Sequence, residues 1–276
     1  MIKLLKIELK KIRTYKIFWI LAGLYFIFLV LGILMAEFMI NNMVDNMNKH
    51  LPIPAPHMNI YFFPEVWQNM AFFATIRYVL IFPAIIIMIL ITNEFTFKTI
   101  RQNVVNGLSK SEFILSKLYI ILLISVITTV FFALSTFIIG IAHTSEVTWG
   151  MIFDKISFVI GFFITILTFQ IYAFFFGFMC RNTGLAIALF TLYTFIIEPI
   201  LYYFLKSPLV FKNGISTYLP VNAVFRVTEY PTIPVLKKMM GLNLQESISW
   251  GGCALPLLYS AIMIGIVFWT LKKRDL

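Results

Sequence analysis

Six apolar runs constrain this chain more than any other feature of its sequence. Each run is about 20 residues long, the length that an α-helix needs to cross the hydrocarbon core of a bilayer. The sequence therefore predicts an all-α integral membrane protein of one domain, residues 1–276. Its six transmembrane helices are expected over residues 17–39, 72–91, 118–142, 156–179, 184–205 and 253–271.

Composition supports the same class of protein. Hydrophobic residues make up 61% of the chain and charged residues 12%, whereas a soluble domain carries about 25% charged residues. The net charge of +10 raises the question of nucleic acid binding. However, the basic residues cluster beside the apolar runs, which is typical of topology signals in membrane proteins rather than of a binding stripe. We therefore expect a lipid bilayer as partner and no nucleic acid.

The first 16 residues predict an amphipathic helix at the membrane interface. Ile2, Leu5, Leu9 and Ile12 recur at helical spacing. The basic residues would then lie near anionic headgroups. A cluster of positive charge that only sets the topology explains them equally well. The basic residues of this segment are Lys3, Lys6, Lys10, Lys11, Arg13 and Lys16.

A polar stretch, residues 93–117, separates the second apolar run from the third. Apolar residues at helical spacing (97, 100, 104 and 108) predict a short amphipathic helix. Gly107 is expected to end that helix, and Ser109 with Glu112 predicts a capping box that starts the next one. We interpret the stretch as a docking element for a soluble partner.

The distribution of basic residues predicts the topology. An even number of spans puts both termini on one side. That side collects six, four, one and three basic residues from the N-terminus, the 93–117 stretch, the 180–183 turn and the C-terminal tail, against seven in the longer opposite loops. Because short basic loops stay in the cytoplasm, we expect both termini to be cytoplasmic in a multi-pass protein of the cell membrane.

Two charged residues lie near the opposite ends of the spans. Arg77 near the start of the second span either extends to the interface or lines a pathway. Glu198, followed by Pro199, either lines an external vestibule or lies at the headgroup level. Pro83 is expected to kink the second span. The segment 206–252 mixes aromatic, aliphatic and proline residues, and folded or re-entrant elements are expected there.

The sequence offers little for catalysis. It contains no G-x-x-x-x-G-K-[ST] motif, so it has no P-loop of its own for ATP. Its three histidines are scattered without metal-ligand spacing, and its two cysteines cannot form a disulfide framework. No Ser/His/Asp or Cys/His arrangement is evident. We expect a chain that is not an enzyme, with no metal site.

The order of these features resembles the permease subunit of an ABC-2 type ABC transporter. The closest local match is Asn93-Glu94, then Lys98-Thr99-Ile100-Arg101, then residues 107–117 (GLSKSEFILSK). That family has an acidic residue, a Thr-hydrophobic-Arg step, and Ser-Arg-x-x-Phe-x-Leu-x-x-Lys after a glycine. The Leu219-Pro220 step is similar to one in the family's last external segment. Lys98 and Lys110 depart from the family pattern, which often has Gly and Arg at these positions.

The resemblance implies a division of labour between subunits. Two permease chains, identical or different, would pair with two ABC ATPase subunits, which would bind the ATP and Mg²⁺. The 93–117 stretch would act as a coupling helix that transmits the closure of the ATPase dimer. The residues that the resemblance assigns to this coupling are Glu94, Thr99, Arg101, Gly107, Ser109 and Lys110.

Three functions remain open on the sequence. The first is an exporter permease, for which apolar and aromatic spans favour a hydrophobic or amphipathic cargo. The second is a membrane scaffold or sensor that works with an ATPase without transport; force transmission would favour a large soluble external domain, and none of the external loops is that large. The third is an ion-coupled carrier, which usually needs charges near the midplane of the membrane.

Overall fold

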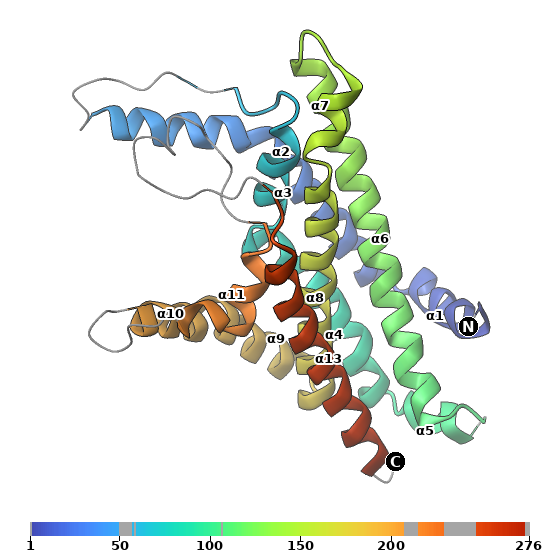
Figure 1. Cartoon of the computed structure of the whole chain (residues 1–276). Helices are drawn as coiled ribbons and strands as arrows, with labels where there is room; N and C mark the ends of the chain where they lie inside the picture. The colour runs from blue at the N-terminus through green and yellow to red at the C-terminus, as the bar shows by residue number, and fades with distance from the viewer. Residues whose placement is uncertain are drawn as a thin grey trace.

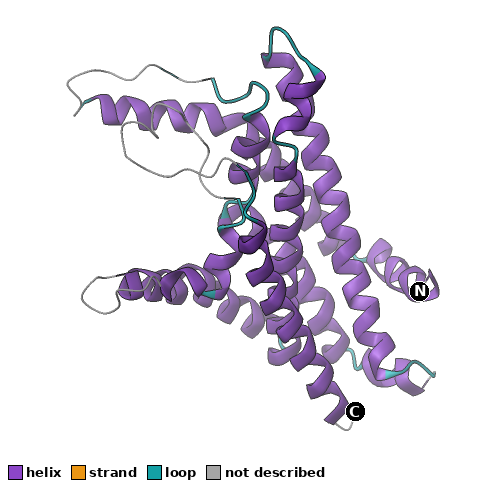
Figure 2. Cartoon of the chain, in the orientation of Figure 1, coloured by secondary structure: helices purple, strands orange, loops and turns teal. Residues whose placement is uncertain are grey.

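The computed structural model describes residues 2–49, 57, 59–105, 107–206, 215–228 and 247–273. In these residues the chain is helical and contains no strand (Figures 1 and 2). Six of the described helices, or helix runs, are long and apolar enough to cross a membrane. The predicted all-α membrane fold with six spans is therefore confirmed.

The described part of the chain is built almost entirely of helices. Two of them are single turns of other helix types: η1, a π-helix, and η2, a 3-10 helix. The elements are α1 (Ile2–Thr14), α2 (Lys16–Asn48), α3 (Val66–Ala74), α4 (Arg77–Thr96), α5 (Thr99–Val105), α6 (Lys110–His143), α7 (Trp149–Asp154), α8 (Ser157–Cys180), α9 (Thr183–Leu192), η1 (Tyr193–Ile197), α10 (Glu198–Lys206), η2 (Ile215–Tyr218), α11 (Pro220–Phe225) and α13 (Trp250–Lys273).

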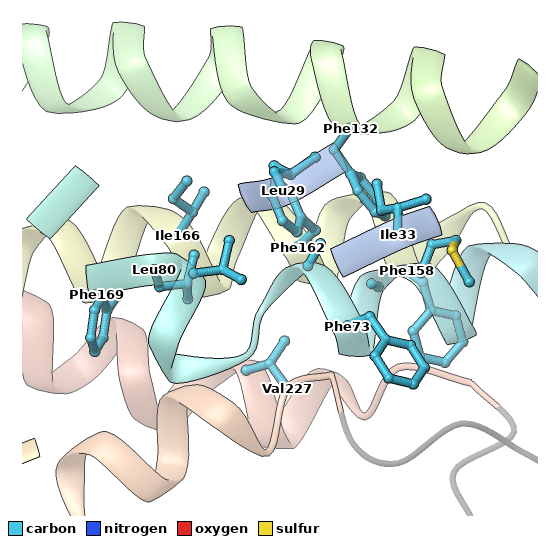
Figure 3. Close-up of a cluster of buried hydrophobic side chains, with 14 of the residues drawn as sticks. Leu29, Ile33, Phe73, Leu80, Phe132, Phe158, Phe162, Ile166, Phe169 and Val227 are labelled. Carbon is cyan, nitrogen blue, oxygen red and sulfur yellow. The ribbon is translucent and has the colours of Figure 1, made fainter. Parts of the chain in front are cut away.

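Helix α8 forms the centre of the bundle and packs against α4, α6, α9 and α13. Its side chains Phe158, Phe162, Ile166 and Phe169 are fully buried, and Figure 3 shows them among residues of α2, α4 and α6. The ring of Phe162 stacks on that of Phe132 with centroids 4.3 Å apart. A helix that is apolar on all sides belongs in such a buried position.

A small residue lets α8 approach α4 closely. A Cβ atom added to Gly177 would lie 2.3 Å from Cγ2 of Ile91 and 3.3 Å from Cα of Met88. In a bilayer, helices associate through close packing because lipid is as apolar as their side chains, so small residues are favoured at such contacts. Gly177 therefore fixes the spacing between the two helices.

The outer helices expose apolar side chains. On α2, Ile20, Ile27, Leu34 and Phe38 are each more than half exposed. Exposed side chains of this kind suit contact with lipid or with another membrane helix. The sequence of α2 is apolar on nearly every face, as a helix needs when one face packs on the bundle and the other meets lipid.

The second span differs from its prediction. It was expected over residues 72–91, but the chain breaks at Thr75 and Ile76, and α4 runs from Arg77 to Thr96. The Thr75 hydroxyl donates to the Ala71 carbonyl at 2.8 Å and also meets the Thr228 hydroxyl, while Ile76 has an extended ψ of 134°. A threonine that bonds to its own helix favours an end there, a signal that hydropathy alone does not carry.

Three local predictions are confirmed. Ser109 accepts the Glu112 N–H in a complete capping box at the start of α6. Gly107 has φ 91°, a backbone conformation that favours glycine, in the turn between α5 and α6. Residues 180–183 form a tight turn in which Asn182 caps α9 by accepting the Leu185 N–H at 3.1 Å.

Some expectations fall partly or wholly outside the described residues. The segment expected to fold over residues 206–252 is described at 206, 215–228 and 247–252, where it forms η2, α11 and the start of α13. The side chains of residues 2–7 and the tail 274–276 also lie outside the description.

Candidate functional site: a charged junction of four helices

Four helices meet at one end of the bundle: α1, the end of α4, α5 and the start of α6. Figure 1 shows that both ends of the described chain lie toward this end, as does α5. A common side for both termini agrees with an even number of spans. We call the ionic cluster that holds this end together the charged junction; its members are Glu8, Lys11, Glu94, Thr99, Ser116 and Lys117.

Lys117 of α6 is the centre of the charged junction. Its Nζ lies 2.7 Å from Oε2 of Glu8 and 2.5 Å from Oε1 of Glu94. All three residues are buried, with exposed fractions of 4–5%. A buried charge is tolerated when it is paired and hydrogen-bonded, and this ammonium group meets two carboxylates.

Lys11 of α1 completes the charge balance. Its Nζ lies 2.7 Å from Oε1 of Glu94 and 3.7 Å from Oε1 of Glu8. The Ser116 hydroxyl donates to Glu8 at 3.2 Å. Two lysines and two glutamates therefore neutralise each other, and the amphipathic helix α1 is attached to both α4 and α6.

Thr99 joins α5 to this cluster. Its hydroxyl donates to the carboxylate of Glu94 and lies 3.3 Å from the Glu94 carbonyl. The connection between α4 and α5 turns sharply, because Lys98 has φ 53°. Ile100, which follows, is buried in an apolar cluster with Phe113 and Ile114 of α6. The short helix α5 is thus fastened by one polar and one apolar contact.

Two of the six residues assigned to coupling, Glu94 and Thr99, lie inside the charged junction. Gly107 and Ser109 form the turn and the cap that lead into α6, and Lys110 is the first residue of that helix and is half-buried. Arg101 lies in α5, and its side chain lies outside the described part of the structure. The structure therefore separates residues that build the junction from residues near its surface.

The amphipathic face expected for the 93–117 stretch is shorter than predicted. Phe97 precedes α5 and is 66% exposed, whereas Ile100 is buried. A groove of about 240 Å³ lies beside Phe97 and reaches Lys11, Glu94 and Thr99. The helical period therefore places Ile100 correctly but does not extend back to Phe97, because the turn at Lys98 interrupts it.

Sequence reasoning missed Glu8. It is the one acidic residue among the first 16, where six basic residues surround it. That reversal of sign, three positions before Lys11, was the available signal. Burial confirms the distinction, since Glu8 is 5% exposed and Leu9 is 42% exposed.

Arg77 and Glu198 lie together at a second place, far from the charged junction. Arg77 starts α4 and Glu94 is near its end, so the two are separated by roughly 26 Å at 1.5 Å per residue. Arg77 donates to the Thr194 carbonyl at 2.9 Å. Glu198 is 1% exposed and accepts the N–H groups of Val221 and Asn222.

Metal ligands do not gather in the described residues: no three His, Cys, Asp or Glu side chains come together there in a way that could hold an ion. The carboxylates of the charged junction are instead occupied by lysine ammonium groups and by hydroxyls. The chemistry of this site is therefore that of a structural ionic lock between helices.

Comparison with known families gives one result. A family model described as "ABC-2 family transporter protein" matches residues 4–197. The match begins within α1 and ends within η1. It therefore covers the charged junction, the first four spans and most of the fifth. A search of curated proteins finds no match.

Proposed function

Because the chain belongs to the ABC-2 family of transporter proteins, we propose that it is the permease subunit of an ATP-driven exporter. Members of this family form the membrane component of ABC transporters, so an ABC ATPase is the implied partner. ATP and Mg²⁺ would be bound by that partner. The cargo would be hydrophobic or amphipathic, in keeping with the apolar and aromatic spans.

In this proposal α5 and the turn after it form the contact with the ATPase. Arg101 and Lys110 would pair with carboxylates of the ATPase, and Gly107 and Ser109 would hold the turn between them in shape. Glu94 and Thr99 take a different role: they fasten α5 to the bundle. The side that carries α1, α5 and the end of α13 would be cytoplasmic.

The observation that supports coupling best is that Thr99 joins α5 to Glu94, which lies in the ionic cluster of α1, α4 and α6. A push on α5 reaches α4 through Thr99 and Glu94, and it reaches α6 and α1 through Lys117 and Glu8. Removing one partner of a buried ion pair costs about 3–5 kcal/mol. The junction would therefore move as a unit when the ATPase closes, instead of yielding at the loop.

A second permease chain completes the proposed assembly. The exposed apolar side chains of α2 and of the α9–α10 run provide surfaces in the membrane for lipid or for that chain. Closure of two ATPase subunits would then act on two charged junctions at once.

Reversal of charge on the surface of the coupling element tests this function. The double variant Arg101→Glu, Lys110→Glu is expected to lose most co-purification of the ATPase, because two proposed ion pairs become repulsive contacts. Transport in proteoliposomes should fall in parallel. The measurement is the ratio of ATPase to permease after affinity purification.

Lys272→Glu with Lys273→Glu is the matched control, since both lysines are exposed at the end of α13 and carry the same change of charge. The control should keep the ATPase. Retention of the ATPase and of transport by the Arg101 and Lys110 variant would overturn the proposed docking surface.

A further inference from the structure

The fifth span contains a carbonyl group that its own helix cannot satisfy. The N–H of Glu198 donates to the Tyr193 carbonyl in the π-helical pattern, and so it does not serve the Thr194 carbonyl. In the same pattern the next donor would be residue 199, which is a proline without an N–H. The Thr194 carbonyl is left without a helical partner, on a residue that is fully buried.

Arg77 supplies the missing hydrogen bond from another span. Its Nη1 donates to the Thr194 carbonyl at 2.9 Å, and its guanidinium lies 4.9 Å from the centre of the Phe225 ring. A buried carbonyl without a donor is costly, and a charged donor forms a stronger bond than a neutral one. Arg77 therefore compensates for Pro199.

The π turn also determines where Glu198 lies. Its carboxylate accepts the N–H of Val221 at 3.0 Å and that of Asn222 at 2.5 Å, the first turn of α11. An extra residue in a helical turn rotates all that follows by about 100°. Without the π turn, Glu198 would point away from α11.

Two tyrosines fasten the same segment from other helices. The Tyr172 hydroxyl of α8 donates to the Pro220 carbonyl at 3.2 Å, and the Tyr259 hydroxyl of α13 donates to the Tyr218 carbonyl at 2.7 Å. Residues 215–228 are therefore held against α8 and α13 as well as against α10.

We propose that Arg77 and Glu198 form a two-part clamp on residues 215–228, in which Arg77 contacts Phe225 and positions Glu198 through the backbone of the π turn. Arg77 replaces the donor that Pro199 lacks, the π turn orients Glu198, and Glu198 holds the start of α11. The clamp holds the segment beside α8 and α13, at the end of α4 away from the charged junction. It does not depend on the ATPase partner or on the cargo.

A double-mutant cycle between Arg77 and Pro199 tests the clamp. In Pro199→Ala, residue 199 regains an N–H, so the Thr194 carbonyl finds a partner in either helical register. We expect Arg77→Met to accelerate amide exchange of residues 193–198 at least about tenfold, the factor for loss of a hydrogen bond to a charged donor. The same substitution in the Pro199→Ala background should accelerate it less than about twofold. Exchange is measured by mass spectrometry on the purified full-length chain.

The second part of the clamp needs its own variant. Glu198→Gln keeps the size of the side chain but weakens acceptance from Val221 and Asn222, and amide exchange of residues 220–225 should rise. Lys155→Met serves as control, because it breaks an ion pair with Glu65 at 3.3 Å that does not involve the clamp; exchange of residues 193–198 and 220–225 should be unchanged.

Several outcomes decide the proposal. An Arg77→Met chain that fails to accumulate while the double variant accumulates supports it. Equal acceleration by Arg77→Met in both backgrounds overturns it, since Arg77 would then act through its charge alone. Failure of both chains to accumulate, or no effect of Arg77→Met, overturns it as well.

Discussion

Lys117 shows how one side chain can connect helices that are distant in the sequence. It is the residue of α6 that meets Glu8 of α1 and Glu94 of α4, over separations of 109 and 23 residues. It is only 5% exposed, so its ammonium group is removed from water. Such a group stabilises the fold only while both carboxylates remain, so the three charges act together.

This dependence predicts an unusual pattern of stability. Lys117→Met should destabilise the chain by about 3–5 kcal/mol, because two buried carboxylates lose their buried partner and keep only the partly exposed Lys11. The triple variant Glu8→Gln, Glu94→Gln, Lys117→Met should recover much of that loss, since it buries no unpaired charge. Thermal unfolding of the purified chain in detergent measures both.

Lys272→Met is the control for loss of a lysine at the same end, because it is exposed, and its midpoint should match that of the native chain. If Lys117→Met unfolds at the native midpoint as well, the charged junction contributes nothing to stability.

At the scale of elements, the start of α6 shows how a local signal fixes a boundary. Ser109 and Glu112 form a reciprocal capping box, and Gly107 makes the preceding turn. The helix therefore begins at Lys110, well before the apolar run at 118. This extension brings Lys117 onto the helix, two turns inside its start, where it can meet α1 and α4.

The cap itself is testable. Ser109→Ala should lower the free energy of opening of the first turn of α6 by about 1 kcal/mol, because the Glu112 N–H loses its acceptor. Faster amide exchange of residues 110–113 measures this. Ser135→Ala, in the middle of α6, removes a hydroxyl that bonds only to the Phe131 carbonyl, and should leave those amides unchanged. Equal exchange in the two variants would contradict the assigned cap.

The elements were predictable to different degrees. Length and hydropathy are enough for the six spans, and spacing of Ser109 and Glu112 is enough for the start of α6. The break at Thr75 was missed, because it depends on a hydroxyl that bonds to its own helix and to Thr228. The π turn at 193–197 was missed too, since Pro199 indicates a disturbed helix but not which carbonyl is freed.

The sequence predicted where the candidate site lies but not which of its side chains pair with one another. Its stretch, 93–117, was recognised from polarity and capping, and Glu94 and Thr99 lie within the charged junction. Glu8 could not be assigned, because its partner Lys117 is 109 residues away and no local pattern joins them. Which charges form long-range ion pairs depends on how distant helices pack, and a local sequence pattern does not predict that packing.

At the scale of the whole molecule, one group of polar contacts lies at each end of α4. The charged junction holds α1, α5 and α6 at its Glu94 end, and the proposed clamp holds residues 215–228 at its Arg77 end. Between them α4 packs closely on α8 through Gly177. This arrangement suits a transporter subunit in which a movement at one end must be carried through a packed interior to the other.

The most direct test of the central claim is the amount of cargo transported per ATP hydrolysed in proteoliposomes that contain the permease and its ATPase. The triple variant Glu8→Gln, Glu94→Gln, Lys117→Met keeps the surface of α5 but removes the ionic links that join Glu94, the partner of Thr99 in α5, to α1 and α6. We predict that it still binds the ATPase and supports hydrolysis, while transport per ATP falls at least about tenfold, the loss expected when a coupling of 1.4 kcal/mol or more is removed. Transport per ATP equal to that of the native chain would contradict the account.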